Sequence, residues 1–265
     1  MKIAIIGVGN LGYSIAVGIL SQKKDIKCHS LYLTKRNLSS LQHLEKLSAV
    51  KTTTDNKRAV KYSDVVIVAV QPAQLKEVLE DIKEVINPKK HTIISVVTGR
   101  KIEEIEAVLG ENTAIIRCMP NTAISVGQSM TCISANEKGK SNIEYAKTIF
   151  NSLGETLCVE EKLMQAATVI CASGIAFWMR LIRATTQGAI QLGFHSADAQ
   201  KLSMQTCLGA ASLLIDSQSH PEQEIDKVTT PSGCTIEGLN EMEHQGLSSS
   251  LIKGLVTSYE KINQI

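Results

Sequence analysis

Three glycines near the start of the chain have the spacing of a phosphate-binding turn. Gly7, Gly9 and Gly12 fit the pattern G-x-G-x-x-G, and they lie between an apolar run at residues 3–6 and an amphipathic stretch at residues 13–20. We interpret this as a strand, a turn and a helix. In that context the first glycine makes the tight turn, the second lets the backbone approach a diphosphate, and the third lets the helix pack on the strand. The pattern predicts a dinucleotide site at the helix N-terminus, and the alternative is a turn that binds nothing.

The residues after the second predicted strand bear on the choice of dinucleotide. In this kind of fold an acidic side chain at that point binds the ribose 2′-OH of NAD, whereas basic side chains accept the 2′-phosphate of NADP. The strand predicted at residues 28–33 is followed by Thr34, Lys35 and Arg36, with no carboxylate among them. Hydroxyl and guanidinium groups both bind phosphate oxygens. The sequence therefore favours NADPH over NADH, and a solvated basic loop is the alternative.

Strands and helices alternate over residues 1–158. Apolar runs without polar alternation, such as residues 65–70, indicate strands that are covered on both faces. The predicted strands are residues 2–7, 28–33, 65–70, 92–97, 114–119, 129–133 and 156–159. The predicted helices between them are residues 38–47, 73–86, 102–109 and 142–153. This alternation predicts an α/β protein whose N-terminal domain is a Rossmann-type, doubly wound parallel sheet that binds NADP.

The second part of the chain, residues 159–265, has no convincing strand. Helical periodicity recurs at residues 164–192, 197–216, 236–244 and 249–262. The segment 166–179 is apolar on nearly every side, so it must be covered all round. We therefore expect an all-helical dimerisation and substrate domain, and a helical cap on the sheet is the alternative.

Composition limits the partners. The 265 residues carry a formal net charge of +2 and only 3% aromatic residues, which disfavours nucleic acid as a partner. Seven scattered cysteines without a C-x-x-C pair indicate reduced thiols rather than disulfides or a zinc site. The longest later apolar segment, residues 166–179, is too short to span a bilayer. We expect a soluble, cytoplasmic protein that binds a small molecule and needs neither membrane nor metal.

Polar loops at the expected ligand edge suggest which bond is reduced. Ligands of open α/β sheets bind beyond the carboxyl ends of the strands, where residues 69–72, 95–99 and 117–122 emerge. The hydroxyl-rich segment 229–235 leads into a predicted helix, whose N-terminus could bind a carboxylate or simply carry a threonine N-cap. None of the six histidines lies in these loops. Because an imine can arrive already protonated, hydroxyl donors suffice for C=N reduction.

From Met1 to about Glu260 the chain resembles the pyrroline-5-carboxylate reductase family. The likeness rests on the glycine fingerprint and on residues 68–72, 116–122, 172–177 and 228–239. It implies NADPH-dependent reduction of 1-pyrroline-5-carboxylate to L-proline. It also implies a homodimer with interlocked helical domains, assembled further in some members, and a substrate pocket formed partly by each protomer.

The resemblance assigns roles to particular residues. Thr235 is the implied catalytic residue and would hydrogen-bond the ring nitrogen. The implied substrate-binding residues are Glu161, Thr230, Ser232, Gly233 and Cys234. The cofactor-binding residues expected from the resemblance and from the strand ends are Gly7, Gly9, Asn10, Leu11, Gly12, Thr34, Lys35, Arg36, Asn56, Val70, Gln71, Pro72 and Thr98.

Five positions depart from the family's usual residues. Gln71 stands where lysine is usual, Ala123 and Ile175 where proline is usual, Ser232 where glycine is usual and Lys227 where asparagine is frequent. Two rival functions stay open. One is another imine or β-hydroxyacid-type oxidoreductase, although the predicted central helix lacks the lysine that a β-hydroxyacid dehydrogenase would use. The other is a non-catalytic NADPH-binding protein.

Overall fold

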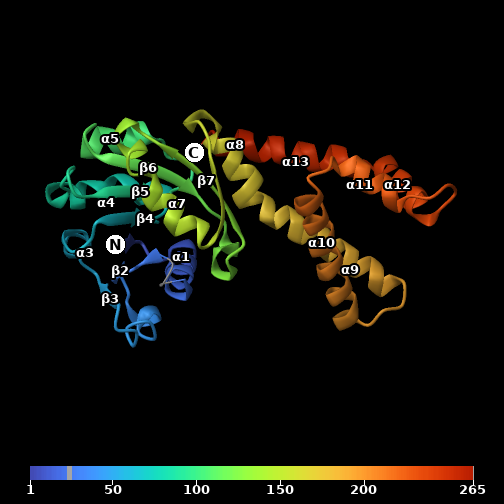
Figure 1. Ribbon diagram of the computed structural model, residues 1–265, viewed down its shortest axis with the longest axis horizontal. Helices are drawn as coiled ribbons and strands as arrows, with labels where there is room; N and C mark the ends of the chain where they lie inside the picture. Colours follow the sequence, from blue (N-terminus) through green and yellow to red (C-terminus); the bar gives the residue numbers. More distant parts are fainter. Residues whose placement is uncertain (23–25, 265) are drawn as a thin grey trace. The chain divides into compact units, whose positions relative to one another are not determined.

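The computed structural model describes residues 1–22 and 26–264, and Figure 1 shows its elements. By packing, the chain divides into two compact units: Met1–Ser173 with Lys261–Ile265, and Gly174–Glu260. The domain boundary predicted between residues 158 and 159 stays a prediction.

One eight-stranded sheet forms the centre of the first unit. Its strand order is β3-β2-β1-β4-β5-β6-β7-β8, and the first six strands have the 3-2-1-4-5-6 order of a doubly wound Rossmann sheet. The predicted fold class is therefore confirmed. The strands are β1 (Lys2–Ile6), β2 (Ser30–Thr34), β3 (Val50–Thr53), β4 (Val65–Val68), β5 (Thr92–Ser95), β6 (Ala114–Met119), β7 (Ser129–Ala135) and β8 (Gly154–Cys158).

The sheet is parallel except at one pair of strands. β7 runs antiparallel to β6, with Cys118 opposite Ile133, whereas β8 is again parallel to β7. A parallel crossover needs about a dozen residues or more. The connection between β6 and β7 is shorter and contains only a 3-10 helix, Thr122–Val126. The prediction of a wholly parallel sheet is therefore wrong at this pair.

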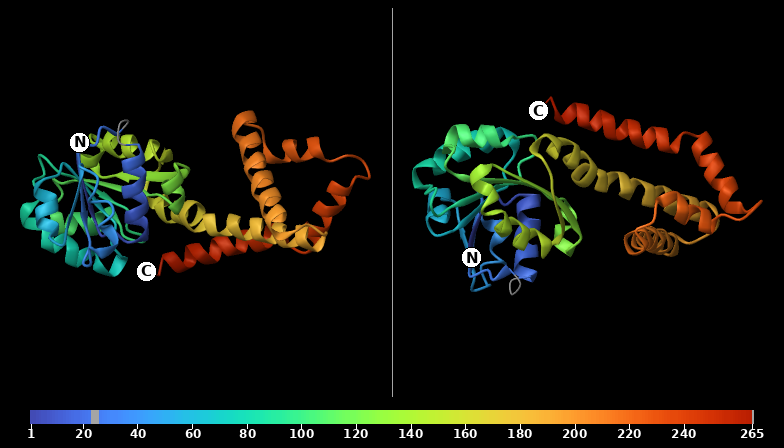
Figure 2. Two further views of the ribbon diagram at one scale, coloured as in Figure 1. Left: turned by 90° about the horizontal axis from the view of Figure 1, so that it is seen from below. Right: turned by 45° about the horizontal axis from the view of Figure 1, so that its top comes forward.

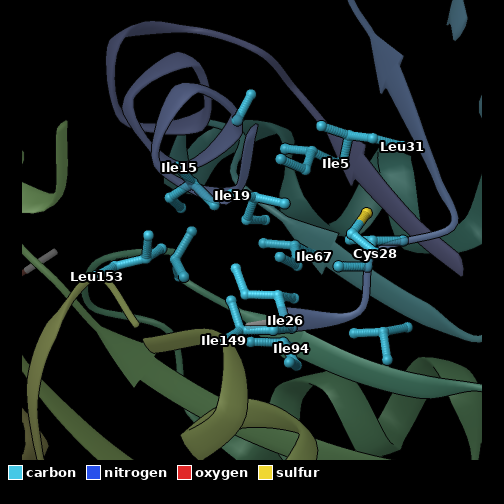
Figure 3. Packing of buried hydrophobic residues seen from close by; sticks show 14 of the residues in the cluster. Ile5, Ile15, Ile19, Ile26, Cys28, Leu31, Ile67, Ile94, Ile149 and Leu153 are labelled. Atoms are coloured by element: carbon cyan, nitrogen blue, oxygen red, sulfur yellow. The ribbon is translucent and has the colours of Figure 1, made fainter. Parts of the chain in front are cut away.

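Helices cover both faces of the sheet. Alternate residues of each strand point to opposite faces, so Ile3 and Ile5 pack on one side, with Ile15 of α1 and Ile149 of α7 (Figure 3). The other face packs against side chains of α3, α4 and α5, including Leu79. The helices of this unit are α1 (Asn10–Ser21), α3 (Asn56–Lys61), α4 (Leu75–Ile82), α5 (Ile102–Leu109), α6 (Glu137–Lys140), α7 (Ile143–Asn151) and α8 (Met164–Ala167).

The helix predicted at residues 38–47 is absent, and consecutive turns take its place. Leu38, Leu41, Leu44 and Leu47 are three residues apart, which matches the 3-10 period of three residues per turn better than the α period. The amide N–H of Leu41 donates to the Leu38 carbonyl, that of Leu44 to Leu41 and that of Leu47 to Leu44. The only regular helix here within the described ranges is the 3-10 helix Ser39–Leu41.

The second unit contains helices and no strand among its described residues (Figure 2). α10 packs against α9, and few side chains of either helix are buried. Large apolar side chains stay exposed, including Trp178 (58%), Leu192 (83%) and Ile215 (72%). The helices are α9 (Gly174–Gln191), α10 (Ser196–Ser217), α11 (Pro221–Val228), α12 (Cys234–His244) and α13 (Leu247–Ile262).

One continuous helical run joins the two units along the chain. It extends over Glu161–Gln191 and includes a π-helical segment, Thr168–Ser173, between α8 and α9. By length and composition alone this run could cross a membrane, and 22% of its most apolar window is buried. The length argument drawn from residues 166–179 therefore does not exclude a membrane span.

Candidate functional site

The first glycine of the fingerprint lies where no other residue fits. Gly7 follows β1 with φ +88°, and a Cβ built on it would lie 2.5 Å from Cγ1 of Val70. Its N–H and that of Val8 donate to the carbonyl of Thr34 at 3.2 and 3.0 Å. These bonds fix the turn between the ends of β1 and β2.

Gly12 is closely packed, whereas Gly9 has open space where a side chain would be. A Cβ on Gly12 would lie 2.6 Å from the carbonyl oxygen of Gly7, so this position must stay bare for α1 to pack on the turn. A Cβ on Gly9 would meet no atom of the described chain within 4 Å. Gly9 is the N-cap of α1 and offers no side chain to its first N–H groups. The helix N-terminus is therefore open to an anion.

A cavity of about 500 Å³ opens beside this turn at the carboxyl ends of the parallel strands. The structure brings to it these predicted cofactor residues: Gly7, Gly9, Thr34, Lys35, Arg36, Asn56, Val70 and Gln71. The lining is completed by residues that were not predicted: Ile6, Val8, Asn37, Thr54, Ala69, Gln74, Glu77 and Val78. The site expected at this edge of the sheet therefore has both the space and the polar groups for a nucleotide.

The three residues after β2 differ in how they are held. Thr34 is buried, and its Oγ1 accepts a 3.4 Å hydrogen bond from the Gly7 N–H. Lys35 donates from Nζ to Oγ of Ser40 at 2.9 Å. Arg36 is exposed and makes no hydrogen bond or ion pair with any described residue. Thr34 thus supports the turn, while the Arg36 guanidinium is free to bind a phosphate.

Two amide side chains line the same cavity from α3 and from the loop after β4. Asn56 is the first residue of α3 and donates from Nδ2 to Oδ2 of Asp81 at 3.2 Å. The Gln71 N–H donates to Oε1 of Gln74 at 3.3 Å, which caps the 3-10 helix Pro72–Gln74. Glu77 adds a carboxylate to the lining, so the cavity is not uniformly basic.

The other predicted cofactor residues do not line this cavity. Asn10 lines a neighbouring one of about 420 Å³, which shares Gly9 and Lys35 with the first. Leu11 packs against the apolar core. Pro72 begins the 3-10 helix after Gln71, and Thr98 lies half-buried in the turn after β5.

Thr54 lines the cavity but was not among the predicted cofactor residues. It directly follows β3, an edge strand with the sequence Val50-Lys-Thr-Thr53 that the prediction missed. A strand with one apolar residue gives no periodic signal. Asn37, another lining residue, lies four residues after the end of the predicted strand at Leu33, and this spacing gave no signal either. Only the threonine-rich run before the Asp55 N-cap of α3 could have suggested a strand and a helix start.

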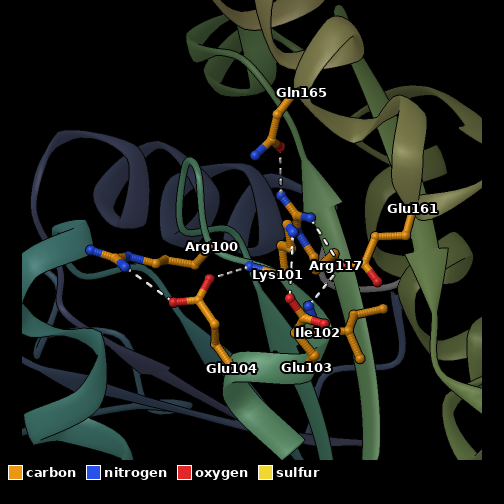
Figure 4. A network of polar contacts seen from close by, with 8 residues as sticks. All are labelled: Arg100, Lys101, Ile102, Glu103, Glu104, Arg117, Glu161 and Gln165. Carbon is orange, nitrogen blue, oxygen red and sulfur yellow. Dashed lines mark hydrogen bonds and ion pairs between the residues drawn. The ribbon is translucent and has the colours of Figure 1, made fainter. Parts of the chain in front are cut away.

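Glu161, an implied substrate-binding residue, is engaged within the first unit (Figure 4). Its Oε1 accepts from Nη1 of Arg117 at 3.0 Å and from the N–H of Ile102 at 2.6 Å. The Arg117 side chain is 2% exposed and also donates from Nη2 to Oε1 of Gln165 at 3.3 Å. This network joins β6, the start of α5 and the start of the long helical run.

The remaining predicted substrate residues lie in the second unit, around the start of α12. The Gly233 N–H donates to the carbonyl of Thr230 at 2.9 Å, and between them Ser232 has the left-handed φ of +58°. Gly233 is the N-cap of α12 and offers no side-chain cap, so the threonine cap considered from the sequence is wrong. Cys234 and Thr235 are the exposed first residues of the helix. Their N–H groups can bind an anion.

Among residues 1–22 and 26–264, no group of three histidine, cysteine, aspartate or glutamate side chains could hold a metal ion.

Known proteins match both parts of the chain. Residues 2–99 match the family described as NADP oxidoreductase, coenzyme F420-dependent, and residues 161–265 match that described as pyrroline-5-carboxylate reductase dimerisation. The chain is 48% identical over 271 residues (98% of its length) to pyrroline-5-carboxylate reductase 1 of Dictyostelium discoideum, but spans only 49% of that relative. It is 44% identical to pyrroline-5-carboxylate reductase 2 of the same organism, covering 98% of this chain and 91% of the relative.

A solved structure agrees with these relatives. The pyrroline-5-carboxylate reductase of Coxiella burnetii is 31% identical and superposes with a TM-score of 0.89, over 99% of this chain and 97% of the other. The fold and the glycine-loop cavity define a protein of the Rossmann-type dinucleotide-binding class. The chain belongs to the pyrroline-5-carboxylate reductase family. Its helical part corresponds to a dimerisation domain, which supports homo-oligomerisation.

Proposed function

We propose that this protein reduces the C=N bond of 1-pyrroline-5-carboxylate to form L-proline, with NADPH as the hydride donor. The observation that carries the proposal is the cavity beside the glycine loop and the open N-terminus of α1. Lys35 and Arg36 line this cavity, and the chain belongs to the family. The chain spans about half the length of the first relative, so the activity in the relatives' names is assigned to it only as part of this proposal.

The residues of the first unit suit NADPH. The N–H groups at the start of α1, beyond Gly9, would bind the diphosphate, helped by the positive end of the helix dipole. Arg36 and Lys35 would bind the ribose 2′-phosphate, and Asn56 and Gln71 would contact the cofactor from the other wall. When bound, NADPH supplies the hydride.

The residues of the second unit suit a small carboxylate. The substrate carboxylate would accept hydrogen bonds from the N–H groups at the start of α12, around Ser232–Cys234, with Thr230 beside them. The exposed Thr235 hydroxyl would hydrogen-bond the ring nitrogen and orient the imine carbon for hydride transfer. In the first unit Glu161, through its bond to Arg117, would act as a positioning residue.

The exposed apolar side chains of the second unit bear on the assembly and the location of the protein. A homodimer would cover Trp178, Leu192 and Ile215, which a monomer leaves exposed. With that cover the long apolar helix needs no membrane. We therefore infer a cytoplasmic homodimer, with higher assembly open, that binds no nucleic acid.

Steady-state kinetics test the proposal. Purified protein should oxidise NADPH only when 1-pyrroline-5-carboxylate is present, and NADH more slowly. Thr235→Ala should lower kcat/KM by about tenfold or more, the loss of one hydrogen bond in the transition state. Thr235→Ser keeps the hydroxyl and should retain most activity, and neither variant should change the Kd for NADPH. Tight NADPH binding without turnover would overturn the proposed reaction, and an unchanged rate in Thr235→Ala would remove that residue from it.

A further inference from the structure

Two cysteine side chains lie in one apolar cluster of the first unit. Cys132 lies on β7 and is 3% exposed, whereas Cys171 lies in the π-helical segment Thr168–Ser173 and is half-buried. Both belong to one apolar cluster with Met119 and Met164, where the π-helical segment packs against β7. The two segments are far apart in sequence, so the fold creates this pair.

The backbone around Cys171 is held in place independently of its thiol. Nδ2 of Asn121, in the loop after β6, donates to the carbonyl of Cys171 at 3.1 Å. The N–H of Asn121 in turn donates to Oγ of Ser129, the first residue of β7, at 3.1 Å. Cys171 is therefore fixed against the two strands that carry the rest of the cluster.

The two thiols are chemically different. The hydrogen bond from Cys132 lowers the pKa of the Cys171 thiol, although its partial burial acts in the opposite direction. The same contact, together with burial, raises the pKa of Cys132. Cys171 is thus the more readily ionised and the more accessible of the two, which are the properties of an attacking thiol. Cys132 is placed to react second.

A second pair of cysteines is held too far apart by the sheet to form a bridge. Cys118 on β6 and Cys158 on β8 lie on either side of Ile133, which is paired with both in the sheet register. Strands are about 4.8 Å apart, so these two backbones are separated by roughly 9–10 Å. A disulfide needs Cα atoms within about 7 Å, so this second pair cannot close without moving a strand.

We propose that Cys132 and Cys171 form a redox-active dithiol that closes reversibly to a disulfide when the protein meets hydrogen peroxide. The Cys171 thiolate attacks one peroxide oxygen, which breaks the O–O bond, releases hydroxide and leaves a sulfenic acid on Cys171. The Cys132 sulfur then attacks the Cys171 sulfur, forms the S–S bond and displaces the sulfenic oxygen, which leaves as water with the Cys132 proton. A small-molecule dithiol such as dithiothreitol reverses the reaction by thiol–disulfide exchange.

The bridge would fasten the π-helical segment to β7. This segment ends at Ser173, where the first compact unit gives way to the second along the chain. A covalent link there restricts local opening of the helix start. Hydrogen exchange of the amides of residues 164–173 should therefore slow in the oxidised protein and recover on reduction.

Peptide mapping of the purified full-length chain tests the proposal. Protein treated with hydrogen peroxide, alkylated and digested with trypsin should yield residues 118–138 linked to residues 163–180, and dithiothreitol should release them. The first peptide also contains Cys118, so fragment ions must assign the bridge to Cys132. The intact mass should fall by two hydrogen atoms. A bridge through Cys118, or oxidation confined to Cys158 and other exposed thiols without a link, would overturn the proposal.

Single variants separate the two roles. In Cys132→Ala the link should be lost and Cys171 should stop at a sulfenic acid that dimedone traps. In Cys171→Ala the link should be lost and Cys132 should stay reduced. Cys158→Ser, an exposed control, should form the link at the wild-type rate. Dimedone labelling of Cys132 in Cys171→Ala would contradict the assigned order, and the wild-type peptide map decides the bridge itself even if a variant does not fold.

Discussion

The guanidinium of Arg117 and the carboxylate of Glu161 form an ion pair of 3.0 Å that joins strand β6 to the start of the long helical run. The Arg117 side chain is 2% exposed and that of Glu161 is 32% exposed. A second bond from the Ile102 N–H to the same carboxylate oxygen adds the start of α5 to the junction. One carboxylate thus ties the start of the long helical run to α5 and β6, which are more distant in sequence.

Glu161→Ala should destabilise the protein strongly. The change leaves the Arg117 charge buried with only Gln165 as a partner. Removing one member of a buried pair costs roughly 3–5 kcal/mol, and the 32% exposure of Glu161 lowers the expected loss to about 2–4 kcal/mol. Glu160→Ala is the matched control, because Glu160 pairs with Lys162 on the surface, with both side chains more than 70% exposed. That change should cost less than about 0.5 kcal/mol. Chemical denaturation measures both, and equal losses would contradict the role given to Glu161.

Gly9→Ala should remove cofactor binding while leaving the fold intact. A Cβ there meets nothing in the described chain but occupies the space above the α1 N-terminus, and the φ of −82° suits alanine. We expect the unfolding free energy to change by less than about 0.5 kcal/mol, and the Kd for NADPH to rise by about tenfold or more, since tenfold is about 1.4 kcal/mol.

Gly12→Ala is the contrasting variant. Its Cβ would clash with the Gly7 carbonyl oxygen, so stability should fall by about 1–3 kcal/mol. Fluorescence titration with NADPH and thermal denaturation separate the two effects. The assignment of the Gly9 space to a ligand fails if Gly9→Ala binds NADPH as tightly as the wild type.

Arg36→Ala should change cofactor preference rather than turnover. The exposed guanidinium has no partner among the described residues, so its loss should leave stability unchanged. A hydrogen bond to a charged group contributes about 1.5–3 kcal/mol, which corresponds to a rise of about tenfold or more in the Kd for NADPH. The Kd for NADH, which has no 2′-phosphate, should stay the same. A parallel loss of affinity for both cofactors would show that Arg36 does not read the 2′-phosphate.

The elements that could be predicted from the sequence are those whose signals are local. The strand, glycine turn and helix at the N-terminus are contiguous, and β6 and α5 have the predicted bounds. The segment at residues 38–47 was misread because its leucines recur every three residues and satisfy both helical periods over a short window. α11 was missed because it is mostly polar, although Pro221 at its first position marks a helix start.

The long-range part of the site could not be predicted. Nothing in the sequence pairs Arg117 with Glu161, because that contact depends on how β6 and the helical run meet in space. The same holds for Thr54 and Glu77, which reach the cavity from segments that carry no cofactor motif. The resemblance named Ser232 as a departure from glycine, and the structure supplies the physical reason in its positive φ.

Ser232→Gly should stabilise the helical unit. A non-glycine residue in the left-handed region costs about 1 kcal/mol, partly offset by the greater chain entropy of glycine when unfolded, so a gain of roughly 0.5 kcal/mol is expected. Ser232→Ala keeps the Cβ and should give no gain. Thermal denaturation at one fixed protein concentration compares them, because assembly also contributes to stability. A lower Tm for the glycine variant would mean that the serine side chain makes a stabilising contact.

The most direct test of the central claim is the stoichiometry of the reaction. Purified protein is mixed with 1-pyrroline-5-carboxylate and a limiting amount of NADPH, and both the NADPH consumed and the L-proline formed are measured. The proposed function predicts one L-proline for each NADPH, and a faster reaction than with NADH. NADPH consumption without L-proline, or no consumption by protein that binds NADPH, would contradict it.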